Sequence, residues 1–219
     1  MTSTRLCDAL SAIRPPEGTE PSALPPYEQT DEYRALIARA KASRMRKAGL
    51  VGPYAEAVSG LGERVSLLAD AGRGAYLWGE PGRGKTYAAA HAVRSAVERQ
   101  SGSRVCARLV TAKRLLDEIR ACYDTGGDAL RRACRIPLLA LDDLGAERPT
   151  EWAVETLTSI VDARTAEGLP TVVTSNLSLG QLRDLWGGTA GKRIASRIAG
   201  ACERIEVTGC DRRMGNGQG

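Results

Sequence analysis

The chain has 219 residues, of which 42 % are hydrophobic and 26 % are charged, so it can form one globular domain with a short extension. Its net charge of +5 permits contact with nucleic acid but does not require it. With three Trp, six Tyr and no Phe, the chain has few side chains on which a series of bases could stack.

Several classes of protein are excluded by pattern. No apolar stretch approaches the roughly 18 residues of a membrane span. The N-terminus lacks the apolar core and the cleavage site of a secretory signal, so we expect a cytoplasmic protein without a membrane. The six cysteines form no CxxC pair and His91 has no nearby thiol partner, which argues against a zinc site and for reduced thiols.

The N-terminal part combines a linker and a helix. Residues 15–28 hold five prolines and read as an extended linker. A basic helix is predicted over 31–48, capped by Thr30 and stopped by Gly49. Its narrow apolar face consists of Tyr33, Leu36, Ile37 and Ala40. The helix therefore either docks on another surface or lies solvated on its own domain.

Beyond this helix, short apolar segments alternate with helical ones. A helix is expected over 54–72. The expected strands are Ala75–Trp78, Arg104–Val110, Pro137–Leu141, Thr171–Ser175 and Arg204–Val207. The expected helices between them lie near 85–99, 112–123, 150–167, 179–185 and 190–199. This alternation predicts an α/β fold in which a five-stranded parallel sheet is covered by helices on both faces.

The stretch "GEPGRGKTY" lies between an expected strand and an expected helix. It matches G-x-x-x-x-G-K-[ST], in which backbone N–H groups at a helix N-terminus hold phosphates. Lys85 would reach the β- and γ-phosphates, and Thr86 would offer its hydroxyl to Mg²⁺. The candidate nucleotide-binding residues are Gly79, Glu80, Pro81, Gly82, Arg83, Gly84, Lys85, Thr86 and Tyr87.

Two carboxylates follow the third expected strand. Asp142 is placed to hold the metal, directly or through its water shell. Asp143 would orient or deprotonate the attacking water. A glutamate is commoner at this position in fast ATPases, and the shorter aspartate predicts slow turnover.

Polar and basic residues follow the later elements. Asn176, after the fourth expected strand, would hydrogen-bond a γ-phosphate or a water, or would cap the next helix. Arg193 and Arg197 share one helix face, and an arginine there is either a surface charge or a contact to a neighbour's γ-phosphate. Arg212 and Arg213 follow the last expected strand.

Five motifs together resemble a known family. In order they are "GEPGRGKT", "LLALDDLG", "TVVTSNLS", "GKRIASRI" and "VTGCDRR". They resemble the motifs of the DnaC/DnaI-type helicase loaders, which share an AAA+ clade with the IstB-type transposition ATPases. The resemblance covers about residues 50–213 and implies an AAA+ ATPase that binds ATP and Mg²⁺. It further implies assembly on single-stranded DNA and delivery of a replicative hexameric helicase of the DnaB type.

The resemblance also implies roles for single residues. Lys85 and Thr86 resemble the Walker A pair, and Asp142 and Asp143 the Walker B pair. Asn176 resembles the sensor-1 residue, which contacts the γ-phosphate side of the nucleotide.

The arginines are implied to act at a subunit interface. Arg197 resembles the arginine finger given to a neighbouring protomer, with Arg193 as the alternative. Arg213 resembles the sensor-2 arginine, with Arg212 as the alternative. Donation across protomers requires a head-to-tail homo-oligomer, either a ring or a spiral.

The resemblance divides the chain into three parts. Residues 1–49 are expected to be an N-terminal extension that binds the helicase, 50–213 the AAA+ ATPase domain, and 214–219 a disordered tail. Candidate DNA contacts on the helix after the second strand are Lys113, Arg114 and Arg120. The alternative is that these three side chains only form the solvent-exposed face of the helix and bind no DNA.

Two other functions remain open, and a third is disfavoured. One is a transposition ATPase of the IstB type, which acts with a transposase on double-stranded DNA. Another is a nucleotide-gated adaptor with little hydrolysis, because Asp143 replaces the commoner glutamate. A small-molecule P-loop kinase is disfavoured, because the sequence shows no acceptor-binding lid.

Overall fold

In a computed structural model of the chain, the described residues are 30–100, 105–122, 128–147 and 149–209. The chain divides into two compact units, Met1–Ala42 and Ser43–Gly219. The second unit begins earlier than residue 50, at which the sequence predicts the start of the ATPase domain. Met45 and Ala48 are buried in the core of this second unit. The predicted linker at 15–28 and tail at 214–219 lie outside the described residues.

Helix α2 (Asp31–Lys47) spans the boundary between the units. Thr30 caps it as predicted, since its hydroxyl accepts a 3.2 Å hydrogen bond from the Tyr33 amide. Gly49 follows the helix with a φ of 81°. A Cβ at Gly49 would lie 2.0 Å from the carbonyl oxygen of Leu109, so only glycine fits where the chain passes this residue.

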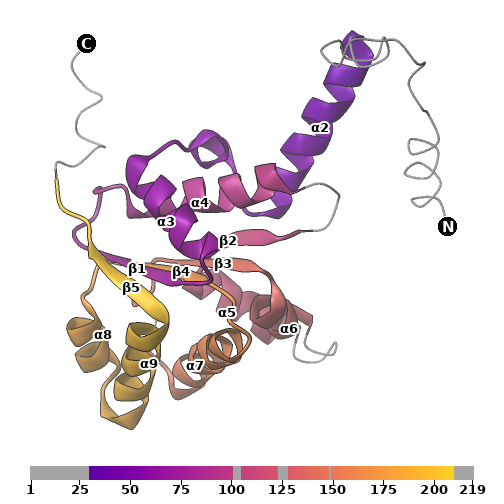
Figure 1. The fold of residues 1–219 in the computed structure, drawn as a ribbon. Coiled ribbons are helices and arrows are strands. Elements are labelled where there is room, and N and C mark those ends of the chain that lie inside the picture. The colour runs from indigo at the N-terminus through magenta and orange to yellow at the C-terminus, as the bar shows by residue number, and fades with distance from the viewer. Residues whose placement is uncertain (1–29, 101–104, 123–127, 148, 210–219) are drawn as a thin grey trace. The chain divides into compact units, whose positions relative to one another are not determined.

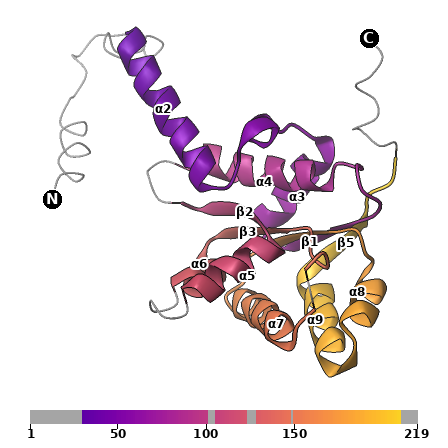
Figure 2. The ribbon, with the colours of Figure 1, turned by 180° about the vertical axis from the view of Figure 1, so that it is seen from behind.

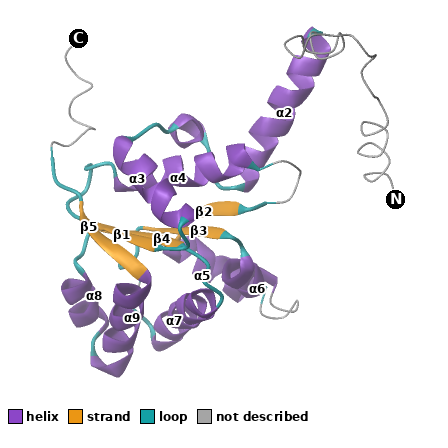
Figure 3. Cartoon of the chain, viewed as in Figure 1, coloured by secondary structure: helices purple, strands orange, loops and turns teal. Residues whose placement is uncertain are grey.

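A five-stranded parallel sheet forms the centre of the second unit, as predicted (Figure 3). Its strands are β1 (Gly74–Trp78), β2 (Ala107–Thr111), β3 (Leu138–Asp142), β4 (Thr171–Ser175) and β5 (Cys202–Glu206). They are ordered β2-β3-β4-β1-β5, and every neighbouring pair is parallel. Because β4 lies between β1 and β3, the segments that leave these three strands meet at one edge of the sheet.

Helices cover both faces of the sheet (Figures 1 and 2). α3 (Gly60–Asp70) and α4 (Lys85–Arg99) lie on one face. The other face carries α5 (Ala112–Ala121), α6 (Asp128–Arg135), α7 (Glu151–Ala166), α8 (Leu179–Trp186) and α9 (Gly188–Ala201). Strand β3 supplies alternate side chains to the two cores, which is why it is apolar at successive positions. No helix in the described part of the chain has the length and apolarity to cross a membrane.

Two predicted details of the helices are wrong. The segment predicted as one helix over 54–72 is a short 3₁₀ helix at Gly52–Glu56 followed by α3. The break occurs because Ser59 caps α3, accepting a 3.3 Å hydrogen bond from the Gly62 amide, while its own amide donates to His91 Nδ1 at 3.0 Å. Helix α6 was not predicted, and its buried residues are only two alanines.

Arg164 of α7 is fully buried and joins several elements. Its guanidinium donates five hydrogen bonds of 2.6–3.3 Å, to Thr171 Oγ1 and to the carbonyl oxygens of Ala133, Ile136, Pro137 and Pro170. Burial lowers its pKa to about 10, so it stays charged at neutral pH. Arg164 thus ties the end of α6 and the starts of β3 and β4 to α7.

Candidate functional site

The glycine-rich loop connects β1 to the first turn of α4. Gly79 has a φ of 141°, and a Cβ there would lie 2.6 Å from the carbonyl oxygen of Val207. Gly84 is the N-cap of α4 in the left-handed conformation and has no side chain that could bond the first amides of the helix. The N-terminus of α4 is therefore open to an anion, as the motif requires.

Lys85 lies within this loop rather than in solvent. Only 7 % of the residue is exposed, and its Nζ donates 2.7 Å hydrogen bonds to the carbonyl oxygens of Gly79 and Glu80. Glu80 and Arg83 form an ion pair across the loop. The ammonium is thus held among the backbone groups that would surround a phosphate.

The other predicted loop residues differ in exposure. Glu80 and Pro81 are exposed, and Gly82 and Arg83 are half-buried. Tyr87 lies in the first turn of α4 and packs against the apolar core beneath it. Its ring therefore has a packing role whether or not it contacts a ligand.

Thr86 and Asp142 are brought together from two elements. Asp142 ends β3, its carboxylate accepts a 2.6 Å hydrogen bond from the Thr174 hydroxyl, and the Thr86 side chain lies close enough to lower its pKa. Burial raises the pKa of Asp142, although the nearby hydroxyls of Thr174 and Thr86 and the Lys85 charge act in the opposite direction. A cation placed at this carboxylate would relieve the cost of its burial.

Asp143 and Asn176 also lie side by side. Asp143 has a φ of 58° and is the one non-glycine residue with positive φ in the described ranges. Its amide donates a 2.9 Å hydrogen bond to Thr174 Oγ1, and its carboxylate accepts a 3.4 Å bond from Asn176 Nδ2. Both side chains are exposed, so a water can reach them.

Two residues near these acids were assigned no role from the sequence. Thr174 holds both aspartates, and the polar cluster after β4 was the only signal for it. Glu147 is 7 % exposed and accepts hydrogen bonds of 3.2 and 3.1 Å from the Gly145 amide. Burial raises the pKa of Glu147. In the sequence it looks like a surface residue of a polar turn, so nothing distinguished it.

Arg193 and Arg197 lie on α9 and share one partner, Asp162 of α7. Arg197 Nε is 2.9 Å from Asp162 Oδ1, and Arg193 Nη2 is 3.3 Å from Asp162 Oδ2. Both arginine side chains are more than half exposed. Within this protomer they pair with Asp162 and are available at the surface. Arg212 and Arg213 lie outside the described residues.

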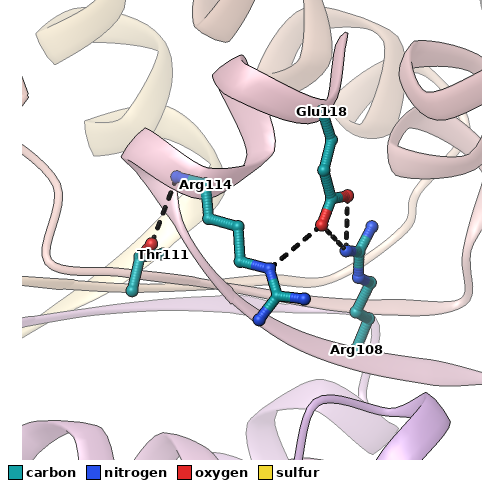
Figure 4. A network of polar contacts seen from close by, with 4 residues as sticks. All are labelled: Arg108, Thr111, Arg114 and Glu118. Atoms are coloured by element: carbon teal, nitrogen blue, oxygen red, sulfur yellow. Dashed lines mark hydrogen bonds and ion pairs between the residues drawn. The ribbon is translucent and has the colours of Figure 1, made fainter. Parts of the chain in front are cut away.

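The candidate DNA contacts on α5 are partly engaged within the protein (Figure 4). Glu118 accepts hydrogen bonds from Arg108, at 2.6 and 2.8 Å, and from Arg114 Nε, at 3.2 Å. Burial acts to raise the pKa of Glu118, but these two arginines outweigh it and the pKa is lowered. Arg120 lies over the Trp152 ring, 4.6 Å from its centroid, whereas Lys113 is exposed.

The donor set fits Mg²⁺ bound together with phosphates. In the described ranges no group of three or more His, Cys, Asp or Glu side chains could hold a metal ion by itself. Thr86 and Asp142 offer one hydroxyl and one carboxylate. Mg²⁺ is commonly held in this way, by one or two protein oxygens, water and substrate phosphates. The residues therefore suit a nucleotide-bound magnesium ion rather than a metal bound by protein alone.

Comparisons with known proteins identify the family of the chain. Residues 67–217 match the family model described as IstB-like ATP binding protein. The chain is 31 % identical over 123 residues to the uncharacterized protein YdaV of Escherichia coli (strain K12), covering 55 % of this chain and 46 % of YdaV. It is 30 % identical over 113 residues to the replicative helicase loader DnaI of Bacillus subtilis (strain 168), covering 51 % and 36 %. The chain thus spans less than half the length of either relative.

Solved structures share the fold. A crystal structure of DnaI is 31 % identical, with a TM-score of 0.58 over 70 % of this chain and 81 % of that chain. The DnaC helicase loader is 23 % identical, with a TM-score of 0.58 over 72 % of this chain and 100 % of that chain; at this identity the likeness concerns the fold alone. The architecture is that of AAA+ P-loop ATPases. The chain therefore belongs to the family of IstB-like ATP-binding proteins.

Proposed function

We propose that the protein is an ATP-dependent loader that assembles on single-stranded DNA and delivers a replicative hexameric helicase. The observation that carries the proposal is the juxtaposition of Lys85, Thr86 and Asp142 in an AAA+ core whose named relatives include a replicative helicase loader. The two units of the chain are proposed to divide the work. The core binds nucleotide and DNA, and the N-terminal extension binds the helicase.

Each residue of the site has a proposed task. Lys85 and the amides at the N-terminus of α4 would bind the β- and γ-phosphates. Thr86 and Asp142 would hold Mg²⁺, while Asp143 and Asn176 would orient the attacking water. Mg²⁺-ATP, when bound, supplies the phosphoryl group that is transferred and the cation that neutralises it. Because Asp143 is one methylene shorter than glutamate, we expect slow hydrolysis, which suits a timing step.

The site is proposed to be completed by a second protomer. Arg197 would contact the γ-phosphate of a neighbour, which requires a head-to-tail ring or spiral. Arg213 would act as sensor 2 within the same protomer. An open spiral of basic protomers can follow a single strand of DNA, with Lys113 among the proposed phosphate contacts.

The first part of α2 is the proposed contact with the helicase. Leu36 is 59 % exposed and Ile37 is 48 % exposed, although both are large apolar side chains. They are two of the four residues of the apolar face that the sequence predicts for this helix. Exposed apolar side chains on a helix are a common way to dock on a groove of a partner.

A pull-down with the replicative helicase tests the loader assignment. The baits are the full-length protein, the double variant Leu36→Asp/Ile37→Asp, and a deletion of residues 1–42, which keeps the buried Met45. The matched control is Leu67→Asp, because Leu67 is 66 % exposed on the second unit. We expect capture by the full-length protein and the control only. Unchanged capture by the deletion would move the contact to the ATPase core, and no capture by any bait would refute the loader assignment.

A DNA-binding measurement separates the loader from a transposition ATPase. Both would bind DNA in the presence of ATP, but a loader prefers single strands. The same titration with single- and double-stranded oligonucleotides therefore decides between them. A preference for the duplex, together with capture of a transposase, would replace the proposal. ATP turnover below detection, with and without DNA, would instead favour a nucleotide-gated adaptor.

A further inference from the structure

We infer that Asp162 is a positioning residue that presents Arg197 to the nucleotide of a neighbouring protomer, with Arg193 as a second support rather than as the finger. The inference rests on the proposed head-to-tail assembly. It assigns a role to Asp162, which lies outside the sequence motifs. It also decides between Arg197 and Arg193, which the sequence leaves as alternative arginine fingers.

The three side chains form one ion-paired cluster between two packed helices. Asp162 places a different carboxylate oxygen against each arginine, at 2.9 Å from Arg197 Nε and 3.3 Å from Arg193 Nη2. On the adjoining face of α9, Ile194 and Ile198 are buried in the core that α7 also lines. Packing therefore fixes the helix, and Asp162 fixes the two arginines on its outer side.

Arg197 and Arg193 differ in the guanidinium nitrogen that faces Asp162. Arg197 faces Asp162 with Nε, in an ion pair of 2.9 Å that is not a hydrogen bond, and Nε lies nearest the aliphatic stem, so both terminal nitrogens of its guanidinium can point to a partner. Arg193 is held by a terminal nitrogen, Nη2, which is part of the fork that binds phosphate oxygens. A carboxylate that pairs by charge with the Nε side of the guanidinium attracts the side chain without occupying its phosphate-binding end. Arg197 therefore has the geometry of the finger.

The cluster contributes little to folding. The side chains of Arg193 and Arg197 are 63 % and 54 % exposed, and ion pairs at such exposure add little to stability. Restraint of a flexible arginine in a productive direction, in contrast, is the kind of effect that changes a rate strongly. Loss of Asp162 should therefore reduce the donation of Arg197 and leave the fold unchanged.

Mixed oligomers test this directly, because they separate the protomer that binds ATP from the one that donates the arginine. Lys85→Ala protomers lack the phosphate-binding lysine but keep Arg197. Arg197→Ala protomers lack the arginine but keep Lys85. Each variant alone should be inactive, and their mixture should regain ATP hydrolysis. Asp162→Asn is then added to one partner at a time. In the Lys85→Ala donor it should reduce the regained activity roughly 10-fold. In the Arg197→Ala acceptor it should change that activity less than about 2-fold.

Three controls keep the outcome unambiguous. Asp70→Asn in the donor removes a comparable exposed ion pair, Asp70 with Arg99 at 2.7 Å, and should have no effect. Asp162→Glu in the donor should restore part of the activity. Thermal unfolding of Asp162→Asn should match that of the parent protein.

Two results would overturn the inference, and they differ. The first is equal ATP hydrolysis by the two mixtures that carry Asp162→Asn in the donor or in the acceptor. Whether both activities are reduced or both unchanged, this result would show that Asp162 does not act through the donated arginine. Failure of the simple mixture of Lys85→Ala and Arg197→Ala to regain activity would instead remove the composite site itself, and the inference with it.

Discussion

The hydroxyl of Thr174 donates a 2.6 Å hydrogen bond to the carboxylate of Asp142. The same oxygen accepts a 2.9 Å hydrogen bond from the amide of Asp143. One side chain of β4 thus fixes both acids at the end of β3, which is possible because the two strands are neighbours in the sheet. The candidate site depends on this bridge for the geometry of its metal-binding and water-orienting groups.

Replacement of Thr174 by valine, which has nearly the same shape, tests the bridge. Thr174→Val leaves the Asp143 amide without its partner and should cost about 1–3 kcal/mol of unfolding free energy. We also expect ATP turnover to fall at least about 10-fold, since both acids lose their support. Urea unfolding and a steady-state ATPase assay measure the two effects. Thr158→Val is the control, because Thr158 is equally buried but bonds only the Val154 carbonyl of its own helix. Normal turnover in Thr174→Val would contradict this role.

Asp142→Asn should raise stability while it abolishes function. Burial raises the pKa of Asp142, so the folded protein holds this proton more tightly than the unfolded chain does. The group's contribution to stability is therefore present at low pH and is lost as the pH rises through the raised pKa. At about pH 7.5 we expect the nucleotide-free variant to melt about 2–4 °C above the parent protein. The difference in melting temperature should narrow as the pH is lowered towards the raised pKa of Asp142, and a variant that melts lower at neutral pH would disprove the explanation.

Two substitutions of Asp143 separate the role of its backbone conformation from the role of its carboxylate. Its φ of 58° is tolerated by Asn as well as by Asp, but is costly for Ala. Asp143→Asn should therefore keep the parent's stability and ATP affinity and lose about 100-fold or more in turnover. Asp143→Ala should lose about 1 kcal/mol of stability in addition. Chemical denaturation and single-turnover hydrolysis distinguish the two variants, and turnover retained by Asp143→Asn would exclude a role for this carboxylate.

Arg164 should be essential for stability and not for catalysis. Replacement by methionine removes the shared donor of four carbonyl oxygens and the Thr171 hydroxyl. We expect a loss of about 3 kcal/mol or more of unfolding free energy. Arg99→Met, which removes an exposed ion pair with Asp70, should cost less than about 1 kcal/mol. A small effect at Arg164 would mean that water replaces its hydrogen bonds.

The sequence alone predicted the features that are formed by residues close together in the chain. The strand, the glycine turn and the helix around Lys85 follow one another in the chain, so their pattern predicts the loop without knowledge of the fold. The strands were predicted because their apolar runs are bounded by polar turns. The polar residues after β3 and β4 could also be expected at one edge, since parallel strands end together.

Features that depend on distant partners were not predictable. Arg164 looks like any helix-surface arginine until the ends of α6, β3 and β4 surround it. The break before α3 depends on the bond between Ser59 and His91, which belong to different helical segments. Asp162 carries no motif, and only the packing of α7 against α9 brings it to Arg193 and Arg197. In each case the deciding contact joins segments that the sequence separates.

The most direct test of the account is the affinity for a non-hydrolysable ATP analogue, titrated with Mg²⁺ and with EDTA. The parent protein should bind the analogue and should bind it at least about 10-fold more tightly with Mg²⁺. Thr86→Val should bind with the same weak affinity under both conditions, because the metal loses its hydroxyl. An absence of binding by the parent protein, or an affinity that is the same with Mg²⁺ and with EDTA, would contradict the proposal that Lys85, Thr86 and Asp142 converge on one magnesium-bound triphosphate.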